Sequence, residues 1–113
     1  MEKERRGLRF AFSASAEIAP ASSPTAFVPA RVTELSFRGC FLETSASYVL
    51  QRPVVVKIYD SGDFFEAEAS VLYVKPSGTG LEFRDVKPHY RAVLQKWILA
   101  ALDKQANAQS SSG

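Results

Sequence analysis

The sequence is poor in the residues from which disulfides and metal sites are made. Its 113 residues include one cysteine, Cys40, and one histidine, His89. A single cysteine excludes a disulfide within the chain and fits a reducing compartment, and one cysteine with one histidine cannot form a transition-metal cage. His89 follows Pro88 with no nucleophile or orienting group suggested nearby, which is typical of an exposed helix-start residue rather than a general base. We therefore expect no metal, no cofactor and no enzymatic activity.

Long apolar runs and phosphate-binding glycine patterns are also missing. No stretch approaches the roughly 18 apolar residues of a membrane helix, and serines and Glu17 interrupt the only candidate signal-peptide core, at residues 10–18. We expect a cytoplasmic protein without membrane insertion. Gly78-Thr79-Gly80 matches no nucleotide-binding glycine motif and fits a turn.

The overall composition is that of one ordinary globular domain. Hydrophobic residues make up 46% of the chain, and the formal net charge is +2. This content is sufficient for a hydrophobic core, and so mild a charge does not require a polyanionic partner.

Alternation of apolar and polar residues predicts a mainly β protein. Period-two segments indicate half-buried strands separated by short turns rich in Pro, Gly, Ser and Asp. From Pro88 onward the apolar spacing changes to three and four, which predicts an amphipathic helix that caps a barrel end or packs on a partner. The expected architecture is a small antiparallel barrel or sandwich with one C-terminal helix. The predicted strands cover residues 10–18, 28–33, 40–43, 54–59, 65–73 and 80–83.

Two segments flank this domain. Residues 1–9 are charged and lack apolar periodicity, so we expect a flexible arm that carries arginines, followed by the barrel and helix over 10–104. Residues 105–113 are polar and serine-rich, and we expect a disordered tail.

Arginines and a donor-rich turn suggest an anion site. The arm contains Arg5, Arg6 and Arg9, and guanidinium groups pair in bidentate fashion with phosphate oxygens and with the O6/N7 edge of guanine. Read alone, such a cluster is more typical of a solvated basic tail. The turn around residues 33–39 offers further polar groups between two strands.

Within that turn, three residues suit a guanine nucleotide that carries phosphates. Ser36 can hydrogen-bond a phosphate oxygen, and Gly39 lets a ligand approach the backbone. Glu34 can orient an arginine or accept hydrogen bonds from guanine N1–H and N2–H.

These motifs, in this order, resemble those of the PilZ domain family. The family pattern R-x-x-x-R appears as Arg5-Arg6-Gly7-Leu8-Arg9, and D/N-x-S-x-x-G appears as Glu34-Leu35-Ser36-Phe37-Arg38-Gly39. A looser third signature corresponds to Gly78-Thr79-Gly80-Leu81-Glu82-Phe83, so the resemblance covers residues 5–83. It implies a six-stranded antiparallel β-barrel with a helix near the C-terminus. It also implies that cyclic di-GMP, a bacterial second messenger, binds between the arginine arm and the barrel surface.

Carried over residue by residue, the resemblance implies roles for the predicted site residues. Arg5 and Arg9 would hold phosphate and guanine with help from Arg6, while Ser36 and Gly39 would form the barrel side. Glu34 stands where the family has Asp or Asn. Its extra methylene pushes the carboxylate outward, which either weakens binding or is accommodated by a shifted arm.

Three functions are weighed on these observations. The leading hypothesis is a cyclic di-GMP receptor whose arm orders on ligand binding and which signals to an effector protein of motility, polysaccharide or pilus machinery. The alternative is a degenerate PilZ domain that binds no nucleotide and acts as a protein-interaction adaptor, suggested by Glu34 and by the helix stripe around Trp97. Binding of single-stranded nucleic acid is disfavoured, because most aromatic residues occupy core-like positions. Both a monomer and a homodimer fit the sequence.

Overall fold

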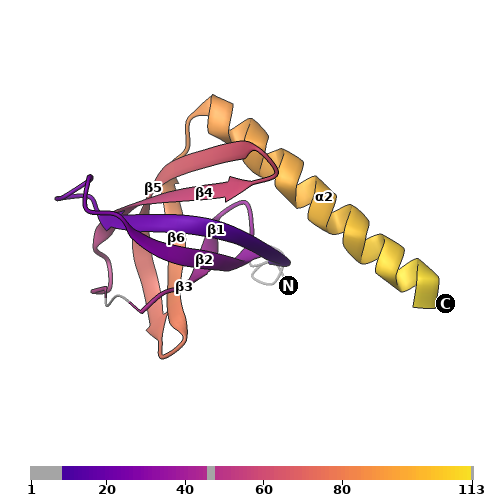
Figure 1. The fold of residues 1–113 in the computed structure, drawn as a ribbon, viewed down its shortest axis with the longest axis horizontal. Helices are drawn as coiled ribbons and strands as arrows, with labels where there is room; N and C mark the ends of the chain where they lie inside the picture. The colour runs from indigo at the N-terminus through magenta and orange to yellow at the C-terminus, as the bar shows by residue number, and fades with distance from the viewer. Residues whose placement is uncertain (1–8, 46–47, 113) are drawn as a thin grey trace.

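The structure, a computed structural model, describes residues 9–45 and 48–112. Six strands precede a helix, and the strands close into a barrel in the order β1-β2-β3-β6-β5-β4 (Figure 1). All neighbouring strands are antiparallel, and β1 closes the barrel by pairing with β4. The predicted six-stranded antiparallel barrel followed by a helix is therefore confirmed. The elements are β1 (Phe10–Pro20), β2 (Val28–Leu35), β3 (Gly39–Glu43), β4 (Pro53–Asp60), β5 (Asp63–Lys75), β6 (Gly78–Asp85) and α2 (Pro88–Ser112).

The barrel interior is filled by the apolar residues of the period-two pattern. Successive side chains of a strand point to opposite faces, so each strand contributes every second residue to the core. On β4, for example, Val54, Val56 and Ile58 are at most 1% exposed. Core residues from the other strands include Ile18, Val32, Leu42, Phe65, Val71 and Leu81.

Two local features of the β-hairpins depend on backbone conformation. The turn between β4 and β5 has positive φ at Ser61 (53°) and Gly62 (81°), the signature of a tight type I′ hairpin turn. Further along β5, the register with β6 shifts between Val71 and Tyr73. Leu72, within the bulge, is half exposed, and the β5–β6 hairpin runs on to Lys75 and Gly78, beyond the predicted strand ends.

Helix α2 covers part of the barrel with its first turns. Leu94, Trp97 and Ile98 are buried, and the Trp97 ring lies 5.3 Å from the Phe12 ring and 6.2 Å from the Phe65 ring. Of the two roles predicted for the helix, packing against the barrel is the one observed. Figure 1 shows the C-terminal part of α2 projecting away from the barrel. Within the described residues, no helix combines the length and apolarity of a membrane span.

The helix is longer than the sequence indicated. It continues to Ser112, whereas we expected it to end near Lys104 and a disordered tail to follow. Alanine, glutamine and lysine are good helix formers, so the helix can continue through Gln105 and Ala106 without an apolar stripe. Disorder of 105–113 in solution stays a prediction, as does the flexibility of the arm, of which residues 1–8 lie outside the described part.

Candidate functional site

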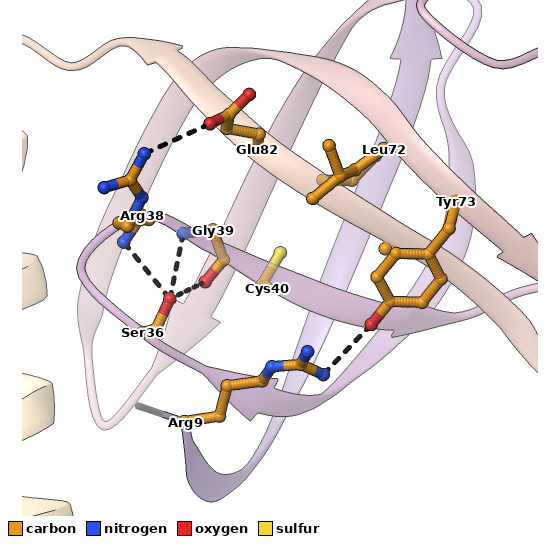
Figure 2. A pocket seen from close by; sticks show the side chains of 10 residues that line it. Arg9, Ser36, Arg38, Gly39, Cys40, Leu72, Tyr73 and Glu82 are labelled. Carbon is orange, nitrogen blue, oxygen red and sulfur yellow. Dashed lines mark hydrogen bonds and ion pairs between the residues drawn. The ribbon is translucent and has the colours of Figure 1, made fainter. Parts of the chain in front are cut away.

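A cavity of about 130 Å³ lies on the barrel surface beside the β2–β3 turn. The turn, the start of β3, the bulged part of β5 and the middle of β6 surround it, and Arg9 approaches from the N-terminal side (Figure 2). The lining residues are Arg9, Ser36, Arg38, Gly39, Cys40, Leu72, Tyr73, Gly80, Leu81 and Glu82.

Ser36 builds the turn at the edge of this cavity. Its backbone N–H donates to the carbonyl oxygen of Gly39 at 2.9 Å. Its hydroxyl accepts hydrogen bonds from the backbone N–H groups of Arg38 and Gly39, both at 3.1 Å, and donates to the Gly39 carbonyl at 3.3 Å. The residue is only 8% exposed. The hydroxyl predicted to meet a phosphate thus satisfies backbone groups of the turn, and its contact with a ligand stays a prediction.

Gly39 brings β3 against β6. A Cβ atom at this position would collide with the carbonyl oxygen of Leu81, so glycine is needed for the close approach of two backbones. The backbone N–H of Phe83 also donates to the carbonyl of Arg38 at 2.7 Å. The observed reason for this glycine is therefore strand packing, and its role in ligand approach stays a prediction.

Arg9 is connected to two residues of different strands. Its Nη1 donates to Glu34 Oε1 and to the Tyr73 hydroxyl, each at 3.0 Å. The guanidinium lies 5.9 Å from the centre of the Tyr73 ring. The hydrogen bond to Glu34 is the largest cause that raises the pKa of Arg9 above its ordinary value, so Arg9 is permanently cationic.

The structure therefore brings together four of the six predicted site residues. Three of them line the cavity: Arg9, Ser36 and Gly39. Glu34 is outside the lining and forms an ion pair with Arg9. Arg5 and Arg6 lie outside the described residues, so their positions stay predictions.

Tyr73 is a cavity residue that the sequence did not indicate. Its ring stacks against Phe41 at 6.1 Å with an interplanar angle of 21°. It also covers Gly80, where a Cβ atom would overlap the ring. The bulge after Val71 sets the pairing of Tyr73 with Gly80. A glycine paired with an aromatic residue on the neighbouring strand indicates that the ring lies over the glycine. This pairing can be recognised only when the register of the two strands is known.

Arg38 and Glu82 were also not predicted as site residues. Arg38 Nη2 lies 3.6 Å from Glu82 Oε2, and Arg84 Nη1 lies 3.4 Å from Glu82 Oε1. Glu82 is thus shared by two arginines, of which Arg38 lines the cavity.

Cys40 is a core residue, as the sequence predicted. It is 7% exposed, and burial raises the pKa of its thiol to about 12. A thiol that stays protonated is a poor nucleophile. Among the described residues, no group of three or more His, Cys, Asp or Glu side chains could hold a metal ion. Two arginines, Arg9 and Arg38, line the cavity, and a guanidinium group can pair with an anion.

Comparisons with known proteins place this fold among known domains. The family described as PilZ domain matches residues 3–100. The PilZ domain of CeSA from a cellulose-synthesizing bacterium is similar with a TM-score of 0.65 and 14% identity, over 88% of this chain and 99% of that one. The PilZ domain of YcgR from Escherichia coli with c-di-GMP is similar with a TM-score of 0.68 and 14% identity, over 94% and 96%.

A third similar structure is that of the Bacillus subtilis inhibitor of motility MotI/DgrA. It has a TM-score of 0.68 and 15% identity, over 88% of this chain and 50% of that chain. At these identities the three likenesses show the fold alone. A search of curated proteins found no match.

Proposed function

This chain belongs to the PilZ domain family, a family of generally non-catalytic cyclic di-GMP receptors, and we propose that it is itself a receptor for cyclic di-GMP. The ligand would bind at the cavity on the barrel surface, between the N-terminal arm and the β2–β3 turn. The protein would act in the cytoplasm by binding, without catalysis.

The observation that supports this proposal is the position of Arg9. It is the last arginine of the R-x-x-x-R motif, and it hydrogen-bonds Glu34, which lies 25 positions away in the second motif. Arg9 also lines one cavity with Ser36 and Gly39 of that motif. A guanidinium at this place can pair with a phosphate or with the O6/N7 edge of guanine.

The arm gives this binding a way to signal. Arg5 and Arg6 precede Arg9, and a ligand that they hold against the barrel would order the arm and create a new surface. That surface would then be recognised by an effector protein. Since one similar structure is that of an inhibitor of motility, motility machinery is the first class of effector to test, before polysaccharide and pilus machinery.

Isothermal titration calorimetry with cyclic di-GMP tests the proposal. We expect saturable binding to the wild type and a loss of about 10- to 100-fold in affinity for Arg9→Ala, the range of a charge-assisted hydrogen bond. Arg31→Ala is the matched control, because Arg31 is an arginine bonded to Ser13 outside the cavity lining. The absence of heat at tens of micromolar protein, with wild type and Arg9→Ala indistinguishable, would refute the receptor function.

One observation favours the second candidate, a degenerate PilZ domain that acts as a protein-interaction adaptor. The Glu34 carboxylate occupies the Arg9 guanidinium at 3.0 Å, so a ligand must compete with it. In that case the wild type shows no binding of cyclic di-GMP in the titration. Glu34→Asp creates binding because the shorter side chain releases Arg9. If the wild type binds and Glu34→Asp leaves the affinity unchanged, the degenerate function is wrong.

A further inference from the structure

Arg38 is a second guanidinium at the cavity, and neither sequence motif assigns it a role. It lines the same cavity as Arg9, and Figure 2 shows the two side chains on opposite sides of Ser36. We propose that Arg38 is a further ligand-binding residue, which leaves Glu82 and binds a phosphate of the ligand. This inference rests on the proposed receptor function and deepens it.

The backbone of Arg38 is fixed by hydrogen bonds, whereas its side chain is exposed and weakly paired. Its N–H donates to Ser36 Oγ at 3.1 Å, and its carbonyl accepts from the Phe83 N–H at 2.7 Å. Its side chain is 56% exposed, and its one described ion pair, with Glu82, is 3.6 Å long. That separation exceeds a good charge-assisted hydrogen bond. A rigid base with a weakly bound guanidinium suits a residue that closes on a ligand.

Glu82 can release Arg38 without being left unpaired. Its other carboxylate oxygen accepts a hydrogen bond from Arg84 at 3.4 Å, and its side chain is 30% exposed, so water can replace Arg38. Losing one partner of an exposed ion pair costs little. Arg84 therefore remains as a partner of Glu82 when Arg38 leaves.

Arg38 also compensates for the departure from the family motif at Glu34. Nη1 of the Arg9 guanidinium already donates to both Glu34 and Tyr73, so this nitrogen must give up a partner before it can bind a phosphate. Arg38 is the cavity guanidinium with the weaker engagement, and its planar fork can bind phosphate oxygens in bidentate fashion.

The test is calorimetric titration of cyclic di-GMP into five proteins. Relative to wild type, we expect Arg38→Ala to weaken binding about 10- to 100-fold and Arg38→Lys to recover part of the loss, because lysine keeps the charge but not the fork. Glu82→Gln should tighten binding, since it frees Arg38. The control, Arg91→Ala, removes an equal charge on α2 outside the cavity and should change affinity by no more than about twofold.

The outcomes separate this inference from the receptor function. If the wild type does not bind, both are overturned. If it binds and Arg38→Ala behaves like Arg91→Ala, only the role of Arg38 is overturned. If Glu82→Gln weakens binding as much as Arg38→Ala, the ion pair acts by supporting the site, and the release of Arg38 is wrong. Melting temperatures of the variants check folding, which should persist because Arg38 anchors the turn through its backbone.

Discussion

Ser36 and Gly39 occupy their motif positions for reasons that exist before any ligand binds. The Ser36 hydroxyl satisfies two backbone N–H groups of a tight turn, and Gly39 lets β3 approach the carbonyl of Leu81. The same residues that mark the family motif therefore shape the cavity wall. At the scale of single residues, the motif that contains Ser36 and Gly39 therefore encodes a turn as well as predicting ligand binding.

The structural role of Ser36 predicts a loss of stability in Ser36→Ala. Two N–H groups would lose their acceptor, and a buried unsatisfied donor costs about 1–3 kcal/mol. Urea denaturation should show this loss, whereas Ser13→Ala, which removes an exposed acceptor of Arg31, should change stability by less than about 0.5 kcal/mol. Equal midpoints for the two variants would contradict the role of Ser36 in the turn.

Cys40 predicts a loss of stability at alkaline pH. Its pKa is raised to about 12 in the folded protein by burial, whereas an exposed thiol titrates at about 8.5. The thiol's contribution to the free energy of unfolding is fully present below about pH 8.5, because the thiol is then protonated in both the folded and the unfolded state. Between the two values only the unfolded chain loses the proton, so stability falls with pH by up to about 1.4 kcal/mol per unit.

Urea unfolding of wild type and Cys40→Ala from about pH 8 to about pH 10 measures this effect. The variant should show a shallower decline. Tyr48 and Tyr59, whose pKa values are also raised by burial, titrate in both proteins, so the difference isolates Cys40. Parallel curves would show that the thiol is accessible to solvent in the folded state.

At the scale of elements, α2 has a packed face and an exposed face. Leu94 and Ile98 are each 1% exposed, whereas Leu99 is 56% exposed. A helix in a protein is stabilised chiefly by packing of its apolar face, so the turn that contains Leu94 and Ile98 secures α2 to the barrel. The ion pair of Lys96 with Asp63, at 2.8 Å, adds little because Lys96 is largely exposed.

Two leucines of the same helix test this division. Leu94→Ala should reduce the free energy of unfolding by about 2–5 kcal/mol, because it creates a cavity in the core. Leu99→Ala is the same change on the exposed face and should cost less than about 0.5 kcal/mol. Guanidinium denaturation compares the two, and similar losses would mean that the exposed face is covered in solution.

At the scale of the whole molecule, closure of the sheet couples the two motifs. β1 pairs with both β2 and β4, and β3 joins β2 to β6, so no strand of the barrel is left as an edge. The end of the arm and the β2–β3 turn are thereby held on one body, the closed barrel. A ligand at the cavity would stabilise that body as a unit.

Ligand binding should therefore raise the melting temperature of the folded chain. At a free cyclic di-GMP concentration of 100 times Kd, linkage gives about 2.7 kcal/mol, which corresponds to roughly 10 °C for a domain of this size. Differential scanning fluorimetry measures the shift, and Arg9→Ala at the same ligand concentration should show a much smaller one. An equal shift in both proteins would place the ligand elsewhere.

Most of the fold was predictable because its signals are local. Alternation in residues 54–59 and 65–73 places β4 and β5, and the Asp60-Ser61-Gly62-Asp63 turn joins them as expected. The bulge after Val71 was not predictable, because it arises from the register of two strands. Hence Tyr73 was missed as a cavity residue. Arg38 and Glu82 were missed because the register of β3 with β6, which pairs Gly39 with Glu82, brings them together.

The sequence by itself determined the number and order of the strands, the presence of a C-terminal helix, the motif order and the family, because hydrophobic period, turn chemistry and motif spacing are encoded along the chain. Only the tertiary structure decided that Arg9 contacts Glu34 and Tyr73 and that Ser36 and Gly39 form the turn and its packing. It also decided that Arg38 shares the cavity with Arg9. These contacts join segments far apart in sequence, and their geometry depends on strand register and barrel closure, which no local pattern specifies.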